Sequence, residues 1–218
     1  MLFLTHHARE SQDKAGLPIY IHHTFTEEFN EKKPMEGIYS SNWPRYNRHK
    51  YGVPVPEAMR LPPKLLMVCK GLKRFNADFF SQHSTEWIVS EHFLTFIKRH
   101  QLLEGTYEQS ELQLVSTTNK SLTEKLYFLL RLTANANALV NFEKTPKLVS
   151  SQKPLTKHTP PDIYYPDFVF QEGVQPPPLF YLDDPSYRYS FFCTEQVKAA
   201  MQQEAFAGFN FYSLPEYA

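Results

Sequence analysis

Residues 87–97 read Trp-Ile-Val-Ser-Glu-His-Phe-Leu-Thr-Phe-Ile, and this stretch decides the fold class. Its apolar start predicts a short buried strand. Ser90 can accept a hydrogen bond from the first turn of a helix, and Glu91 follows where the positive end of the helix dipole favours an acid. Apolar residues then recur at helical spacing and predict one buried helix face: Phe93, Phe96 and Ile97.

A second stretch, Phe191-Phe-Cys-Thr-Glu195, repeats this strand–cap–helix pattern 104 residues later. Thr194 takes the place of Ser90, and Val197, Ala200 and Met201 form the apolar helix face. Only the glutamate is identical in the two aligned cores, so two interpretations stay open. The units are either independent, or products of an ancient duplication that gives two similar lobes, each unit ending at a glycine (Gly105 and Gly208). Both interpretations predict α+β architecture.

Working outward, apolar runs and alternation predict further elements. Strands are expected at 64–70, 111–117, 179–182, 187–192 and 209–212, and helices at 74–80, 91–100 and 195–206. We therefore expect an α+β fold with a mostly antiparallel β-sheet and a few short helices. Seven prolines among the first 63 residues disfavour long helices there. This predicts a proline- and aromatic-rich segment, 1–63, packed on a domain formed by 64–218, as one globular unit overall.

The segment 121–143 admits two readings. Ser121-Leu-Thr-Glu124 matches the capping box that begins helices. Alternatively, apolar runs at 127–130 and 138–140 flank Ala134-Asn-Ala-Asn137, which suits a turn between two strands. We favour the hairpin.

Composition excludes several protein classes. The chain has 218 residues, of which 42% are hydrophobic and 21% charged, as in globular proteins. Its longest apolar run, Leu126 to Leu130, is too short to cross a membrane, and no secretory signal is visible at the start. The two cysteines, Cys69 and Cys193, do not form a disulfide framework, and we expect both to be reduced. These features predict a soluble cytoplasmic protein.

The usual motifs of catalysis are missing. No two of the seven glycines lie closer than 15 residues, so the sequence contains no glycine-rich phosphate-binding loop. Both cysteines lie in apolar strand contexts, where a thiol packs as a small hydrophobe. His92 and His100 share a helix face but lie two turns apart, too far to bind one ion. We expect no cofactor, no metal and no enzymatic activity.

Charge is separated along the chain. Residues 43–75 carry eight basic side chains and one acid, whereas residues 160–218 carry eight acids and two basic side chains. Such fields steer charged partners. Because the whole chain is neutral, nucleic acid is an unlikely partner and a protein is favoured. Tyrosine and charged residues in these zones are the predicted partner-binding residues: Arg45, Tyr46, Arg48, Tyr51, Tyr164, Tyr165, Asp183, Asp184 and Tyr187.

Three groups of motifs between about residues 62 and 212 resemble the immunity proteins of bacterial polymorphic toxin systems, of the type VI or Rhs-like kind. They are Asp78–Phe80 with Trp87–Leu94, Lys125–Leu132 with Leu139–Glu143, and Phe191–Lys198 with Gly208–Tyr212. The resemblance implies a small cytoplasmic protein that binds the C-terminal domain of its cognate toxin and is not an enzyme. It also implies that 125–143 form a β-hairpin.

The sequence thus favours an immunity protein that neutralises a toxin domain by occlusion. One alternative is an enzyme with an unrecognised active site that reverses the modification made by the toxin. The other is a nucleic-acid-binding adaptor that uses residues 43–75, whose binding would depend steeply on salt.

Overall fold

The computed structural model describes residues 1–7, 21–25, 32, 57–83, 85–149, 163–187 and 189–217. The chain divides into two compact units. Unit 1 consists of Met1–His6, Asn135–Ala205 and Phe209–Ala218, and unit 2 consists of His7–Ala134 and Phe206–Gly208. None of the described helices is long and apolar enough to cross a membrane.

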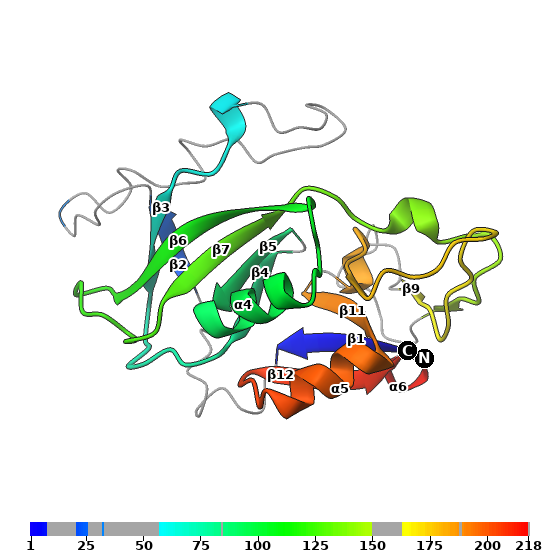
Figure 1. Cartoon of the computed structure of the whole chain (residues 1–218). Coiled ribbons are helices and arrows are strands. Elements are labelled where there is room, and N and C mark those ends of the chain that lie inside the picture. Colours follow the sequence, from blue (N-terminus) through cyan, green and yellow to red (C-terminus); the bar gives the residue numbers. More distant parts are fainter. Residues whose placement is uncertain are drawn as a thin grey trace. The chain divides into compact units, whose positions relative to one another are not determined.

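Unit 2 is built on a six-stranded sheet with the order β2-β3-β6-β7-β5-β4 (Figure 1). Strands β3 and β6 are parallel, and the other neighbouring pairs are antiparallel. The strands are β2 (Ile21–Phe25), β3 (Lys64–Cys69), β4 (Phe79–His83), β5 (Glu86–Ser90), β6 (Tyr107–Ser116) and β7 (Tyr127–Leu132). A 3₁₀ turn, Glu57–Met59, precedes β3.

Both faces of this sheet are covered near β5, all five residues of which are buried. On one face, the ring of Phe79 makes edge contacts with Trp87 and with Phe93 of helix α4 (Glu91–Arg99). On the other face, Ile88 belongs to an apolar core with Met67 and other residues of β3, β6 and β7. A strand that is buried on both faces reads as a continuous apolar run, as residues 87–89 do.

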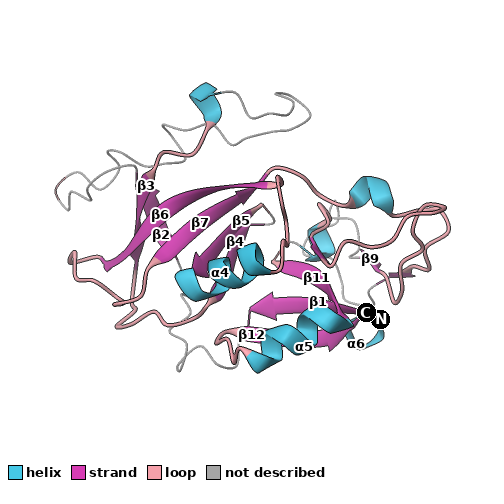
Figure 2. Cartoon of the chain, in the orientation of Figure 1, coloured by secondary structure: helices cyan, strands magenta, loops and turns pink. Residues whose placement is uncertain are grey.

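Unit 1 contains a four-stranded sheet with the order β10-β11-β1-β12. Figure 2 labels β11, β1 and β12 of this sheet. Strand β11 pairs antiparallel with both β1 and β10. The elements are β1 (Leu2–His7), β10 (Leu179–Phe180), β11 (Ser190–Thr194), α5 (Glu195–Gln203), β12 (Phe209–Ser213) and α6 (Leu214–Tyr217). Two-residue strands β8 (Leu148–Val149) and β9 (Ile163–Tyr164) also pair, and 3₁₀ turns cover Asn137–Leu139 and Pro185–Tyr187.

The predicted α+β class, with mostly antiparallel strands and short helices, is confirmed. The strands expected at 64–70, 87–89, 111–117 and 209–212 and the helices at 91–100 and 195–206 are present, with ends shifted by a few residues. The strand expected at 187–192 begins only at Ser190, because Tyr187 lies in a 3₁₀ turn. The boundary proposed after residue 63 stays a prediction, since most of residues 1–63 lie outside the described ranges.

The helix expected at 74–80 is wrong. Residues 74–78 have no regular structure, and Phe79 begins strand β4. The reason is that Phe79 packs against Phe93, whereas Phe80 joins the apolar core on the opposite face of the sheet. Successive side chains that point to opposite faces require a strand.

The reading of 121–143 is corrected in its second half. Residues 127–132 form a strand, as the hairpin requires, but its partners are β5 and β6 rather than residues 138–140. Neither the hairpin nor the capped helix forms, because the amide of Ala136 donates to the carbonyl of Tyr181 and Asn137 begins a 3₁₀ turn. The chain passes from unit 2 to unit 1 between Ala134 and Asn135.

Candidate protein-interaction surface

A cluster of tyrosines forms in unit 1 around Tyr187. The ring of Tyr187 stacks on Tyr165 and on Tyr217, with ring centroids 6.0 and 5.8 Å apart. Tyr164 stands edge-on to both Tyr187 and Tyr217, at 6.5 and 5.8 Å. Three different elements, β9, the 185–187 turn and α6, therefore bring their tyrosines to one place.

Tyr187 forms the buried centre of this cluster. Its side chain exposes only 1% of its surface, and its hydroxyl accepts a hydrogen bond of 2.8 Å from the amide of Tyr165. Burial raises the pKa of Tyr187, and the charge of Asp184 adds to that rise. The phenol therefore stays neutral and holds the surface tyrosines in position.

Two aspartates lie beside the tyrosines and are held by short local contacts. One carboxylate oxygen of Asp184 accepts from the amide of Ser186 at 2.9 Å, and the other lies 3.5 Å from the hydroxyl of Tyr165. Burial, followed by the charge of Asp184, raises the pKa of Tyr165. The backbone of Asp183 exchanges two hydrogen bonds with the amide side chain of Asn137, which leaves the Asp183 carboxylate exposed.

The structure brings together five of the nine predicted partner-binding residues: Tyr164, Tyr165, Asp183, Asp184 and Tyr187. Asp183 is exposed and Tyr164 and Asp184 are partly exposed, whereas Tyr165 and Tyr187 are buried beneath them. The other four, Arg45, Tyr46, Arg48 and Tyr51, lie outside the described residues. We call the set Tyr164, Asp183, Asp184, Tyr212 and Tyr217 the tyrosine–aspartate surface.

Tyr212 and Tyr217 were not predicted from the sequence. Their rings lie 6.0 Å apart, and both side chains are partly exposed. The predicted strand at 209–212 could have indicated Tyr212, as its last residue. No local pattern indicates Tyr217, because its contacts with Tyr164 and Tyr187 come from distant parts of the chain.

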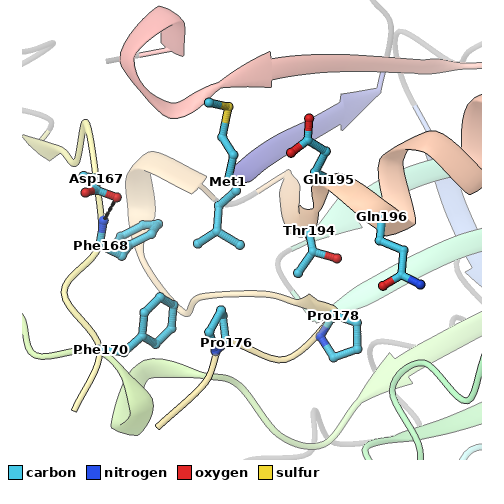
Figure 3. A pocket seen from close by; sticks show the side chains of 10 residues that line it. Met1, Asp167, Phe168, Phe170, Pro176, Pro178, Thr194, Glu195 and Gln196 are labelled. Carbon is cyan, nitrogen blue, oxygen red and sulfur yellow. Dashed lines mark hydrogen bonds between the residues drawn. The ribbon is translucent and has the colours of Figure 1, made fainter. Parts of the chain in front are cut away.

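A pocket of about 480 Å³ opens in unit 1 between the β11–α5 corner, the start of β1 and the 167–178 segment (Figure 3). Its walls contain aromatic rings and prolines, and two acids also line it. The lining residues are Met1, Leu2, Asp167, Phe168, Phe170, Pro176, Pro178, Thr194, Glu195 and Gln196. Phe168 connects the pocket to the tyrosine cluster, because its ring also contacts Tyr165 and Tyr187.

The thiols of Cys69 and Cys193 are both buried. Burial raises the pKa of Cys69 to about 12 and that of Cys193 to about 11. For Cys193, a hydrogen bond with the hydroxyl of Thr5 and the charge of Lys198 partly oppose the rise. A thiol is a nucleophile only as the thiolate, so neither cysteine is activated. Among the residues that the structure describes, no three His, Cys, Asp or Glu side chains gather where they could hold an ion.

Comparison with known proteins bears on the family of the chain. No curated protein matches the chain. The family model described as Immunity protein 43 matches residues 9–218. That match includes every element of unit 2 and almost all of unit 1, and it agrees with the resemblance of the motifs to toxin-immunity proteins. The chain therefore belongs to the Immunity protein 43 family.

Proposed function

We propose that this protein neutralises a cognate antibacterial toxin domain in the cytoplasm by covering it with the tyrosine–aspartate surface. The observation that carries the proposal is convergence. Tyr187 and four other residues chosen from the sequence for partner binding come together in the fold. Membership of an immunity protein family supports a toxin as the kind of partner.

The side chains of this surface suit a tight protein interface. Tyrosine contributes a large contact area at a low cost in side-chain entropy, and its hydroxyl can pair with polar groups of the partner. Here the rings are already packed against one another, so little order has to be gained on binding.

The sign of the charge indicates the chemistry of the partner. The described part of unit 1 carries eight acids and three lysines. Asp183 and Asp184 place two of these acids beside the tyrosines. A basic face on the toxin domain is the complementary partner, and its attraction speeds encounter.

Binding measurements test the interface directly. The toxin domain encoded next to this chain is expressed in an inactive form, and its affinity for each variant is measured by calorimetry. Tyr164→Ala is expected to weaken the complex at least about thirtyfold, as removal of a central aromatic anchor does, and Asp183→Ala about fivefold. Tyr107→Ala and Glu104→Ala, in unit 2, are the matched controls and should leave the affinity unchanged. Equal effects in both sets would contradict the proposed surface.

Stoichiometry separates occlusion from the enzymatic alternative. An inhibitor that covers its target must be present in at least equimolar amounts, whereas an enzyme that reverses damage protects when it is much scarcer. Titration of this protein against active toxin domain in a cell-free assay should give protection that reaches its maximum at a ratio of one to one. Full protection at a ratio of one to a hundred would overturn the proposal.

A further inference from the structure

We infer that the pocket of unit 1 receives a basic loop of the partner, with an arginine or lysine side chain seated between Asp167 and Glu195. This inference rests on the proposed function, because the loop belongs to the toxin domain. It adds a second contact site, distinct from the tyrosine–aspartate surface, and assigns the chemistry that the site recognises.

The size of the pocket suits the seating of a side chain. Its volume of about 480 Å³ falls within the range of pockets that enclose small ligands. In Figure 3, Phe168 and Phe170 lie on one side, Pro176 and Pro178 below, and Thr194 and Glu195 on the other side. Flat rings on the walls accept a guanidinium or ammonium group by cation–π contact.

The walls are held by ring packing behind them and by a backbone hydrogen bond between two lining residues. The ring of Phe168 packs edge-on against Phe192 at 5.2 Å, and Phe170 packs against Phe180 at 6.2 Å. The carbonyl of Pro178 accepts the amide of Thr194 at 3.0 Å. The pocket is therefore formed before a partner arrives, which lowers the cost of binding.

The charged side chains of the lining are of one sign. Asp167 and Glu195 are both exposed acids, and none of the ten lining residues is Lys, Arg or His. The nearest lysine along the chain, Lys198, has its ammonium group 3.7 Å from the ring centroid of Phe3. Because both carboxylates are exposed, their attraction for a cation is screened by salt and is strongest at low ionic strength.

The first experiment removes the charge and keeps the shape. Asp167→Asn with Glu195→Gln is compared with wild type for binding to the inactive toxin domain. We expect the Kd to rise at least about tenfold at low salt. The double variant Glu104→Gln with Glu124→Gln makes the same change in net charge in unit 2, and we expect its effect to be less than about twofold. If the two double variants behave alike while Tyr164→Ala still weakens binding, the pocket inference is overturned and the proposed function stands.

A second experiment does not need the toxin. Acetyl-arginine amide and its neutral isostere acetyl-citrulline amide are titrated into the labelled protein, and amide shifts are followed by NMR. Arginine should move the signals of Phe168, Phe170 and Gln196, citrulline should not, and the Asn/Gln double variant should abolish the shifts. Equal shifts with both probes, or none with arginine, overturn the inference. Selective arginine shifts in a protein that fails to bind the toxin domain would contradict the proposed function instead.

Discussion

The molecule contains two corners at which a strand passes into a helix with the same pattern of residue types, and they differ in the hydrogen bonds that the residue before the helix makes. At the β5–α4 corner of unit 2, the hydroxyl of Ser90 accepts the amide of Phe93 at 3.1 Å and donates to the carboxylate of Asp78 at 2.6 Å. At the β11–α5 corner of unit 1, the side chain of Thr194 makes no cap bond and lines the pocket.

The difference lies in what surrounds the hydroxyl. Asp78 is buried. Besides the hydrogen bond from Ser90, its carboxylate accepts hydrogen bonds from the amide of Ala207 and from the ammonium group of Lys125. The carboxylate of Asp78 therefore holds the β5–α4 corner in place through these hydrogen bonds. Thr194 is partly exposed, and its neighbours Glu195 and Gln196 also line the pocket. One local pattern thus serves stability in unit 2 and, by our proposal, recognition in unit 1.

Removing the Asp78 carboxylate at the β5–α4 corner should have the largest effect on stability. We expect Asp78→Ala to lower the free energy of unfolding by about 3–5 kcal/mol, because the amide of Ala207 and the hydroxyl of Ser90 lose their buried acceptor. Chemical denaturation measures this loss. Asp183→Ala, which removes an exposed carboxylate, should stay within about 0.5 kcal/mol. A loss below about 1 kcal/mol for Asp78→Ala would show that water replaces the carboxylate and that Asp78 does not hold the β5–α4 corner in place.

The next largest loss of stability is expected from a substitution of Gly208, the residue after Ala207. Its φ is +92°, and a Cβ there would lie 2.9 Å from the Cβ of Ala77. We expect Gly208→Ala to cost about 2–3 kcal/mol, from backbone strain and the clash together. Gly105→Ala is the matched control, since its φ is +66° with no atom within 4 Å, and should cost about 1 kcal/mol. Adding Ala77→Gly to Gly208→Ala should restore part of the loss. If it restores nothing, the clash is not the cause.

The sequence predicted the elements whose pattern is local. Helix α4 is an example, because Ser90, Glu91 and the apolar residues of one face all lie within ten positions of the sequence. The polar role of Asp78 could not be predicted in this way. Its partners at 90, 125 and 207 are distant in sequence, and nothing local shows that they meet.

The same limit applies to the candidate surface. Tyr164, Asp184 and Tyr187 were chosen from the sequence because aromatic and acidic residues gather near prolines. The sequence could not show that Tyr187 would be buried under its neighbours, since burial depends on rings contributed by β9 and α6. Thr194 was expected to cap its helix by analogy with Ser90, and this was wrong. The pattern of residue types is the same, but the hydrogen bond does not form.

Truncating the two hydroxyls should separate the corners more finely. Ser90→Ala removes a cap bond and the bond to Asp78, and we expect it to cost about 1–2 kcal/mol. Thr194→Val keeps the shape of the side chain, removes only the hydroxyl and should stay within about 0.5 kcal/mol. Thermal and denaturant unfolding of both variants measures the difference. Equal losses would mean that Thr194 caps its helix in solution and that the two corners are alike.

The variants with the smallest expected effect test whether water reaches the residues behind Thr194 at the β11–α5 corner. Cys193 lies next to Thr194, and Cys69 lies in unit 2; both are fully buried. Burial raises the pKa of each thiol in the folded state, to about 11 and about 12, above the ordinary value of 9.0. The stability that follows is present below pH 9 and is lost as the pH rises, because only the unfolded chain then releases the proton. Between pH 8 and 9.5 each thiol should account for a loss of about 0.8 kcal/mol.

Cys69→Ala and Cys193→Ala, each unfolded by denaturant in the presence of a reductant at both pH values, isolate the two contributions. If each variant loses about 0.8 kcal/mol of the pH-dependent stability, water does not pass the hydroxyl of Thr194. Cys193 in β11 is then as well shielded from water as Cys69 in β3. A clearly smaller change for Cys193→Ala would mean that the thiol already ionises in the folded state. Water would then reach one residue further into unit 1 than the burial of Cys193 indicates, and the contrast between the corners would extend from their surface into the sheet.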